Sequence, residues 1–180
     1  MLDQDELRRV IVAAPTAEAR AVLLLTYDLA LRCGEVCKVR GDQIDFARGV
    51  SRVPRLKAGK VHDLQLAPAT VDALRPLVIG PDLIFPAWSA DRVRQTYRSV
   101  AAAAGVDVRP ATEGGKGYSH ILRRSRAIHL QDDGAPLVEI QWRLGHRSPK
   151  TTQIYLNTLT ARGRAAADRR AVAAVQGIVA

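Results

Sequence analysis

One change in the spacing of hydrophobic residues constrains the fold of this chain more than any other feature. Between Asp45 and Ala67, apolar and polar residues alternate in the stretches "GVSRVP" and "VHDLQLAP", which lie on either side of "KAGK". Alternation with a period of two is typical of half-buried strands, and a glycine between lysines suits a tight turn. This region therefore predicts a two-stranded antiparallel hairpin.

Elsewhere the spacing of hydrophobic residues is that of helices. Thr16, Ser89 and Ser148 are suited to cap the first turn of a helix, whereas Gly105 and Gly145 are suited to end one. We expect helices at 2–14, 16–32, 33–39, 69–78, 89–105, 119–133, 136–144, 149–157 and 161–179. The expected fold class is therefore α+β, mainly α-helical with a small antiparallel sheet.

The chain is strongly basic, with a net charge of +9 over 180 residues and a sequence pI near 10.2. Most of the basic residues are arginines, which suit bidentate contacts with phosphate, so nucleic acid is the leading expected partner. The alternative is a basic protein whose charge serves only solubility. A chain of this length favours a single domain over 1–180, and we interpret the Gly-rich segment 109–119 as a loop within it.

The cysteines indicate a reducing compartment, and the hydrophobic segments indicate a chain that does not span a membrane. Cys33 and Cys37 lie one helical turn apart without the four ligands of a structural zinc site, so we interpret them as core thiols. The longest apolar block, 21–31, is interrupted by Asp28 and predicts a buried helix and not a membrane span. We therefore expect a cytoplasmic protein that does not enter a membrane.

Three pairs of residues are candidates for chemistry. Arg32 lies three positions before Glu35, a spacing at which the side chains can meet, although a surface ion pair is the common alternative. His120 and Arg123 have the same spacing, for which a solvated helix face is the alternative. Lys57 and Lys60 flank the predicted hairpin turn, where charged residues are ordinary.

Taken together with His146 and Tyr155, these residues match the requirements of phosphoryl transfer by a side-chain nucleophile. Planar guanidinium groups fit the charged nonbridging oxygens of a phosphodiester transition state. A lysine on a hairpin can protonate a leaving oxygen. Tyrosine has a pKa near 10 and needs a neighbouring base or cation before it can attack.

The order of the segments "ALRCGEV", "LKAGK", "SHILRR" and "LGHRSPKTTQIY" resembles the catalytic domain of the tyrosine recombinases, also called the phage integrase family. The resemblance extends from the first expected helix almost to the last residue, and the stretch from "LGH" to "TTQIY" is highly specific. It implies the DNA breaking-rejoining fold. It also implies cleavage and rejoining of DNA strands without a metal, ATP or another cofactor.

Carried over to this sequence, the resemblance implies that Tyr155 attacks DNA to give a 3′-phosphotyrosyl bond and a free 5′ hydroxyl. Arg32 and Arg123 would hold the scissile phosphate, and His146 would donate a hydrogen bond to it.

The resemblance also implies that Lys57 is the general acid, that His120 assists removal of the tyrosine proton, and that Glu35 orients the first arginine. Lys60 remains an alternative to Lys57. Arg124 stands where the family usually has a histidine, which adds a positive charge near the expected site.

The implied partners are double-stranded DNA of the nucleoid and further copies of the chain, as a tetramer with the C-terminal helix docking on a neighbour or on its own domain. An N-terminal core-binding (SAM-like) domain, which family members usually carry, does not precede Met1, so we expect a fragment of a longer protein in preference to a minimal stand-alone member. Two other activities remain open. One is relaxation of DNA in the manner of a type IB topoisomerase, and the other is DNA binding without cleavage.

Overall fold

The computed structural model describes residues 1–53, 63–107, 120–146, 150, 152 and 160–179. It divides into two compact units, Met1–Ser125 and Arg126–Ala180. Within the described residues, no helix combines the length and the apolar composition needed to cross a membrane.

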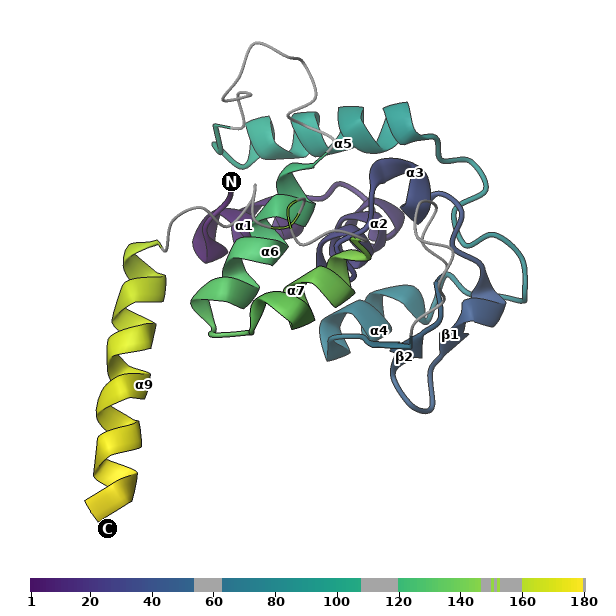
Figure 1. The fold of residues 1–180 in the computed structure, drawn as a ribbon. Helices are drawn as coiled ribbons and strands as arrows, with labels where there is room; N and C mark the ends of the chain where they lie inside the picture. The colour runs from purple at the N-terminus through teal and green to yellow at the C-terminus, as the bar shows by residue number, and fades with distance from the viewer. Residues whose placement is uncertain (54–62, 108–119, 147–149, 151, 153–159, 180) are drawn as a thin grey trace. The chain divides into compact units, whose positions relative to one another are not determined.

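The first unit contains most of the helices and the sheet. Its helices are α1 (Gln4–Val12), α2 (Ala17–Asp28), α3 (Cys33–Val36), α4 (Pro68–Leu74) and α5 (Ala90–Ala103), with a 3₁₀ helix at Gly41–Gln43. Helix α2 packs on α4 on one side, and α5 packs on α1 and α3 on the other, so α2 lies between α4 and α5 (Figure 1).

The sheet has three short antiparallel strands in the order β1 (Ile44–Asp45), β2 (Val50–Ser51) and β3 (Leu64–Gln65). The pairing of β2 with β3, in which Ser51 lies opposite Leu64, confirms the predicted hairpin. Strand β1 was not predicted from the sequence. Asp45 turns the chain back toward β2 by accepting hydrogen bonds from the backbone N–H groups of Ala47 and Arg48 at 3.0 Å each.

Local capping explains where these helices begin. Asp3 and Glu6 form a reciprocal capping box at the start of α1. The side chain of Thr16 accepts a hydrogen bond from Ala19 N–H in α2, and Ser89 accepts one from Arg92 N–H in α5. The two predicted caps at Thr16 and Ser89 are therefore confirmed.

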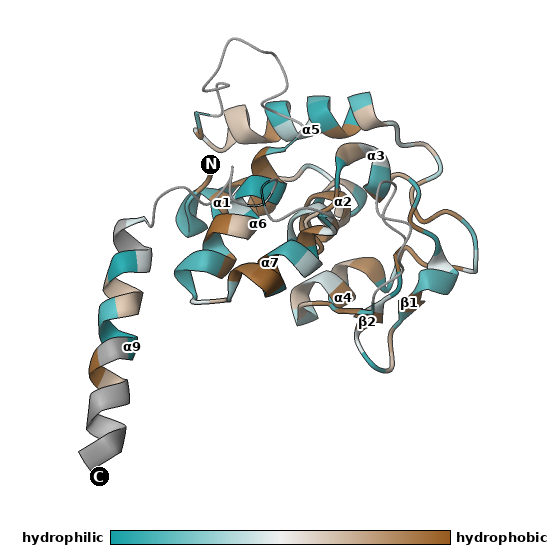
Figure 2. Cartoon of the chain, viewed as in Figure 1, coloured by the Kyte–Doolittle hydropathy of each residue, from teal (hydrophilic) through white to brown (hydrophobic). Residues whose placement is uncertain are grey.

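Two groups of buried hydrophobic side chains fill the first unit, and α2 contributes to both. One group joins α2 to the sheet, α3 and α4, and the other joins α1 and α5 around Leu23. Helix α2 is buried on nearly all sides, which confirms the predicted core helix. Figure 2 shows hydrophobic and hydrophilic residues along the turns of α5, as expected for a helix with one buried face.

The second unit contains the end of α6 (Ile121–Asp132), α7 (Leu137–Leu144) and α9 (Ala161–Val179). The hydroxyl of Thr160 donates to Asp132 Oδ2 at 2.5 Å and accepts from Gly163 N–H at 3.0 Å, so Thr160 caps α9 and ties its start to the end of α6. Gly145 ends α7 in the left-handed conformation, as predicted. Of the helix predicted at 149–157, only Lys150 and Thr152 are described, and both are helical.

Three predicted helix ends were wrong. Helix α3 ends at Val36 instead of residue 39. Helix α2 ends at Asp28 instead of Arg32, because Ala30 adopts a φ of 51° and Leu31 N–H donates back to Thr26 O at 2.9 Å. Helix α4 ends at Leu74 instead of residue 78, because Pro76 has no N–H to donate and so interrupts the helical hydrogen bonds, although Arg75 itself keeps a helical φ of −49° and ψ of −46°.

Candidate active site

Arg32 and Glu35 meet across the first turn of α3. Arg32 Nη1 lies 2.7 Å from Glu35 Oε1, and Arg32 N–H donates to Glu35 Oε2 at 2.8 Å. The Glu35 side chain is 0% exposed and that of Arg32 is 23% exposed. The alternative of a surface ion pair is therefore wrong, since the carboxylate is buried and orients a guanidinium that stays partly accessible.

Arg123 is a second buried cation in this region. Only 1% of the residue is exposed, and its Nη1 donates to the carbonyl of Ala30 at 2.5 Å. Ala30 is the one non-glycine residue with positive φ among the described residues. A buried guanidinium needs acceptors, so this left-handed residue is part of what holds Arg123 in place. The alternative of a solvated helix face is wrong for Arg123.

Glu35 links the two arginines electrostatically. Burial by itself raises the pKa of the Glu35 carboxyl, but the hydrogen bonds from Arg32 and the positive charges of Arg32 and Arg123 outweigh it and lower the pKa. Glu35 is therefore a carboxylate at neutral pH. The carboxylate is hydrogen-bonded to Arg32 and is also influenced by the charge of Arg123, and two positive charges of this kind suit a phosphate.

His120 is half-buried and immediately precedes α6. The sequence predicted a helix from residue 119, so His120 and Arg123 were expected on one helix face. The helix begins two residues later, at Ile121, and the carbonyl of His120 accepts from Arg124 N–H at 2.7 Å. His120 therefore lies at the start of the first turn that also contains Arg123, while Arg124 is exposed.

His146 lies in the second unit, just after the left-handed Gly145. Its backbone N–H donates to Gln141 O at 3.1 Å, and the Gln141 side chain donates to the His146 carbonyl at 3.1 Å. The ring Nδ1 lies 2.9 Å from Oγ1 of Thr152, which is a buried residue. Both the backbone and the ring of His146 are thus held by neighbours in the chain.

Lys57, Lys60 and Tyr155 lie outside the described residues. The strands on either side of the lysines are joined by Arg52 and Asp63, whose side chains form a bidentate ion pair with distances of 2.8 and 3.1 Å. This hydrogen-bonded pair lowers the pKa of Asp63 and raises that of Arg52. Opposite charges therefore join the end of β2 to the start of β3.

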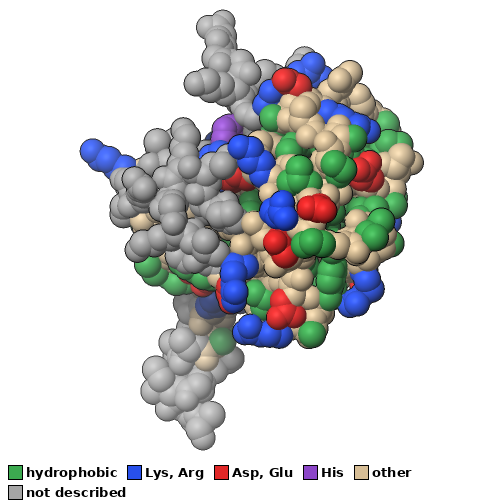
Figure 3. Space-filling view, turned by 90° about the vertical axis from the view of Figure 1, so that its right-hand side faces the viewer, with side chains coloured by type: hydrophobic (Ala, Val, Ile, Leu, Met, Phe, Trp, Pro, Cys, Tyr) green, Lys and Arg blue, Asp and Glu red, His purple; other side chains and the backbone are tan. Residues whose placement is uncertain are grey.

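Acidic side chains accompany the basic ones elsewhere in the first unit. Arg40 lies 3.4 Å from Asp42 and 3.6 Å from Asp82. Figure 3, which views the molecule from the right-hand side of Figure 1, shows basic and acidic side chains close to one another. The net positive charge is therefore not a uniform field on this face.

Two other features are the thiol of Cys33 and the residue types that could bind a metal ion. Burial raises the pKa of the Cys33 thiol to about 11, so at neutral pH Cys33 is a protonated, weakly nucleophilic thiol, as expected of a core cysteine. Over the described ranges, His, Cys, Asp and Glu side chains form no group of three that could hold a metal ion.

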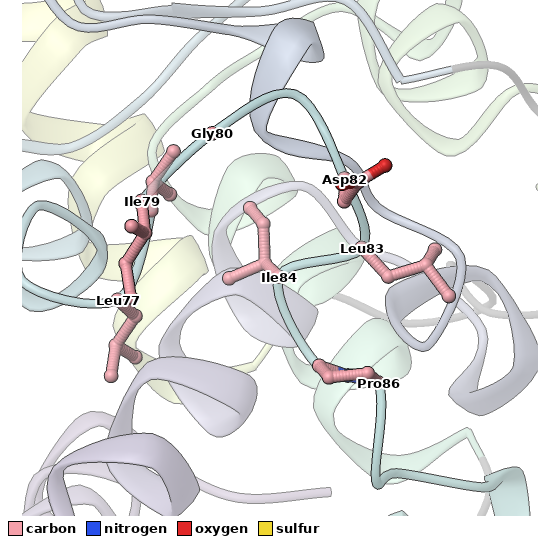
Figure 4. Close-up of a pocket in the computed structure, with 8 residues that line it drawn as sticks. Leu77, Ile79, Gly80, Asp82, Leu83, Ile84 and Pro86 are labelled. Carbon is pink, nitrogen blue, oxygen red and sulfur yellow. The ribbon is translucent and has the colours of Figure 1, made fainter.

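A separate pocket in the first unit lies in the loop after α4. Figure 4 shows Leu77, Ile79, Leu83 and Ile84 along it, with Asp82 at one side. Its lining is mainly apolar and its one charge is negative, so it does not suit a phosphate. Ile79 is 97% exposed there.

Two residues of the site were missed by sequence reasoning. The contact of Thr152 with His146 had a signal, because Thr152 lies six residues after the histidine and three before Tyr155. The role of Ala30 had none, because alanine rarely adopts positive φ and only its carbonyl is used.

The chain is similar to one protein family and to individual recombinases. Residues 1–162 match the sequence model of the phage integrase family. Tyrosine recombinase XerD of Vibrio vulnificus is 32% identical in an alignment of 158 residues that covers 79% of this chain and 50% of the relative. Tyrosine recombinase XerA of Thermococcus kodakarensis is 29% identical in an alignment of 168 residues that covers 86% of this chain and 56% of the relative. The chain thus spans about half the length of the curated relatives it matches.

Solved structures with the same fold were also found. The crystal structure of a XerA recombinase superposes with a TM-score of 0.79 at 24% identity, covering 94% of this chain and 64% of the other. The catalytic domain of bacteriophage HP1 integrase superposes with a TM-score of 0.69 at 15% identity, covering 87% of this chain and 86% of the other. These likenesses confirm the fold class expected from the sequence.

Proposed function

Because the chain belongs to the phage integrase family, we propose that it is the catalytic domain of a site-specific DNA recombinase that cuts and rejoins DNA strands through Tyr155. The observation that carries this proposal is the arrangement of Arg32 and Arg123 around the buried carboxylate of Glu35. Two guanidinium groups held near one anion are suited to a phosphodiester.

In the proposed reaction, the phenolic oxygen of Tyr155 forms a bond to the scissile phosphorus while the bond to the 5′ oxygen breaks. The product is a 3′-phosphotyrosyl bond and a free 5′ hydroxyl. One phosphoester replaces another, so the energy of the cut bond is retained and ATP is not required. The reverse reaction, with a 5′ hydroxyl from the same or another strand, releases the tyrosine.

The arginines act on the charge of the transition state. Arg32 is oriented by Glu35 yet partly exposed, so it can reach a bound phosphate, and Arg123 adds a second positive charge. His146 donates a hydrogen bond to a nonbridging oxygen. Because these groups supply the stabilising charge, we propose that the reaction needs no metal ion.

Two proton transfers complete the step. Lys57 donates a proton to the leaving 5′ oxygen, with Lys60 as the alternative donor. His120 assists removal of the proton from Tyr155, which has a pKa near 10 when unperturbed.

The partner we propose is double-stranded DNA, which fits the net charge of +9 and places the protein in the cytoplasm with the nucleoid. One structural neighbour is a lambda integrase tetramer bound to a Holliday junction. We propose that this chain likewise acts as one catalytic domain per protomer in a tetramer on DNA. Helix α9 would dock on a neighbouring protomer, and its Val172, which is exposed, is available for such a contact.

The proposal is tested by incubating the chain with supercoiled plasmid in the presence of EDTA and without ATP, followed by trapping with detergent. We expect protein covalently attached to DNA, and no adduct with Tyr155→Phe. Relaxed circles without strand exchange would instead favour a topoisomerase-like activity. DNA binding without any adduct would favour a binding module.

A further inference from the structure

Thr152 is held against His146 inside the second unit. Thr152 is 0% exposed, and its Oγ1 lies 2.9 Å from Nδ1 of His146. A buried hydroxyl costs free energy unless it forms a hydrogen bond, so this contact is a defined feature and not a chance approach of two surface side chains.

The position of the histidine is fixed independently of this contact. Gly145 turns the chain at the end of α7, and two hydrogen bonds join the backbone of His146 to Gln141. With the backbone held, the remaining freedom of His146 is the rotation of its ring and the nitrogen that carries the proton. The contact with Thr152 restricts the rotation of the ring and also influences which ring nitrogen is protonated.

The chemistry of the partner decides which nitrogen is protonated. A backbone carbonyl or a carboxylate beside Nδ1 only accepts, and would require a proton on Nδ1. A hydroxyl can donate as well, which allows Nδ1 to accept and places the proton on Nε2. A nonbridging phosphate oxygen only accepts, so a neutral histidine must present an N–H to it. Since Nδ1 is occupied by Thr152, that N–H must be on Nε2.

We propose that Thr152 is a positioning residue that donates its hydroxyl hydrogen to Nδ1 of His146 and so holds the ring in the Nε2–H form. This rests on the proposed function, in which His146 donates to the scissile phosphate. Thr152 also lies three residues before Tyr155 in the sequence, so one side chain ties the phosphate donor to the segment that carries the nucleophile.

The protonation of the ring can be measured without DNA. The chain is labelled with ¹⁵N in its histidines, and the ring nitrogens are recorded by long-range ¹H–¹⁵N NMR at about pH 8.5, above the ordinary histidine pKa. The chain has four histidines, and a His146→Gln variant identifies the signals of His146. We expect Nδ1 of His146 to be unprotonated and Nε2 to be protonated.

Thr152→Val removes the hydroxyl at nearly constant volume, and we expect it to increase the Nδ1–H form, whereas Thr152→Ser should keep the wild-type pattern. Thr70→Val is the matched control, because Thr70 is also buried and its hydroxyl has no hydrogen-bond partner among the described residues. It should leave the His146 signals unchanged. A protonated Nδ1 in the wild type, or a tautomer unaffected by Thr152→Val, would overturn the proposal.

The same variants separate positioning from folding in a cleavage assay. Thr152→Val should slow formation of the covalent adduct about tenfold or more, and Thr152→Ser should restore most of the rate. In a His146→Ala background, Thr152→Val should have little further effect, because the two residues act as one unit. A wild-type chain that forms no adduct contradicts the proposed function, while the NMR measurement still decides the role of Thr152.

Discussion

At the scale of single residues, the site depends on charges that are buried and paired. Arg123 is among the largest fully buried side chains among the described residues, and Glu35 is buried beside Arg32. A buried charge is tolerated only with partners, which here are the carbonyl of Ala30 and the carboxylate of Glu35. Glu35 therefore has a structural effect that can be measured apart from any DNA chemistry.

We predict that Glu35→Gln lowers the free energy of unfolding by about 2 kcal/mol at neutral pH, because it removes charge-assisted hydrogen bonds to Arg32. The measurement is urea denaturation followed by circular dichroism. Glu139→Gln, at an exposed position of α7, is the control and should change stability by less than about 0.5 kcal/mol.

The difference between the wild type and Glu35→Gln should depend on pH. The pKa of Glu35 is lowered in the folded chain, so its contribution is fully present above its ordinary unfolded value of about 4.3 and is lost as the pH falls through the lower folded value. The two stabilities should therefore converge in acid. A difference that stays constant down to about pH 3 would contradict this account of Glu35.

At the scale of helices and strands, the sequence predicted best what is decided locally. Thr16, Ser89 and Gly145 act on their own turn of helix, and their positions were predicted correctly. The end of α2 was predicted incorrectly, because it depends on the positive φ of Ala30. The carbonyl of Ala30 accepts a hydrogen bond from Arg123, which is far away in the sequence. Strand β1 was also missed; it is two residues long, like β2 and β3, and its pairing with β2 was not inferred from the sequence.

Long-range contacts between helices and strands could not be predicted from the sequence either. Asp28, the last residue of α2, is buried and its Oδ2 accepts from Ala67 N–H at 2.7 Å, just before α4 begins. In the sequence Asp28 only interrupted an apolar block. The structure shows that it fixes the start of one helix against the end of another.

We predict that Asp28→Ala destabilises the chain by about 2 kcal/mol, because it leaves the amide of Ala67 without this acceptor. Thermal unfolding by calorimetry measures the effect. Asp72→Ala, which removes an exposed carboxylate from α4, should cost less than about 0.5 kcal/mol. Equal effects of the two variants would show that the contact to Ala67 contributes little.

At the scale of the whole molecule, the family could be identified from the order of short motifs, but the partners of each motif residue could not. The motifs singled out Arg32, Arg123 and His146, and only the structure showed their contacts with Glu35, Ala30 and Thr152 respectively. Such contacts depend on side-chain placement between elements, which spacing along the chain does not encode. The net charge of +9 favours nucleic acid as the partner, which stays a prediction.

We predict that affinity for a random-sequence DNA duplex falls at least about tenfold as salt rises from about 50 mM to about 200 mM, because binding releases counterions from phosphates. Fluorescence anisotropy of a labelled duplex measures this dependence. An affinity that does not change with salt would argue against phosphate contacts as the main source of binding.

The most direct test of the central claim is to locate the covalent bond between protein and DNA. The trapped adduct is digested with nuclease and protease, and the modified peptide is sequenced by mass spectrometry. We predict one nucleotide joined through its 3′ phosphate to Tyr155, while the other three of the chain's four tyrosines are unmodified. A nucleotide on another residue, or a 5′-phosphate linkage, would contradict the account.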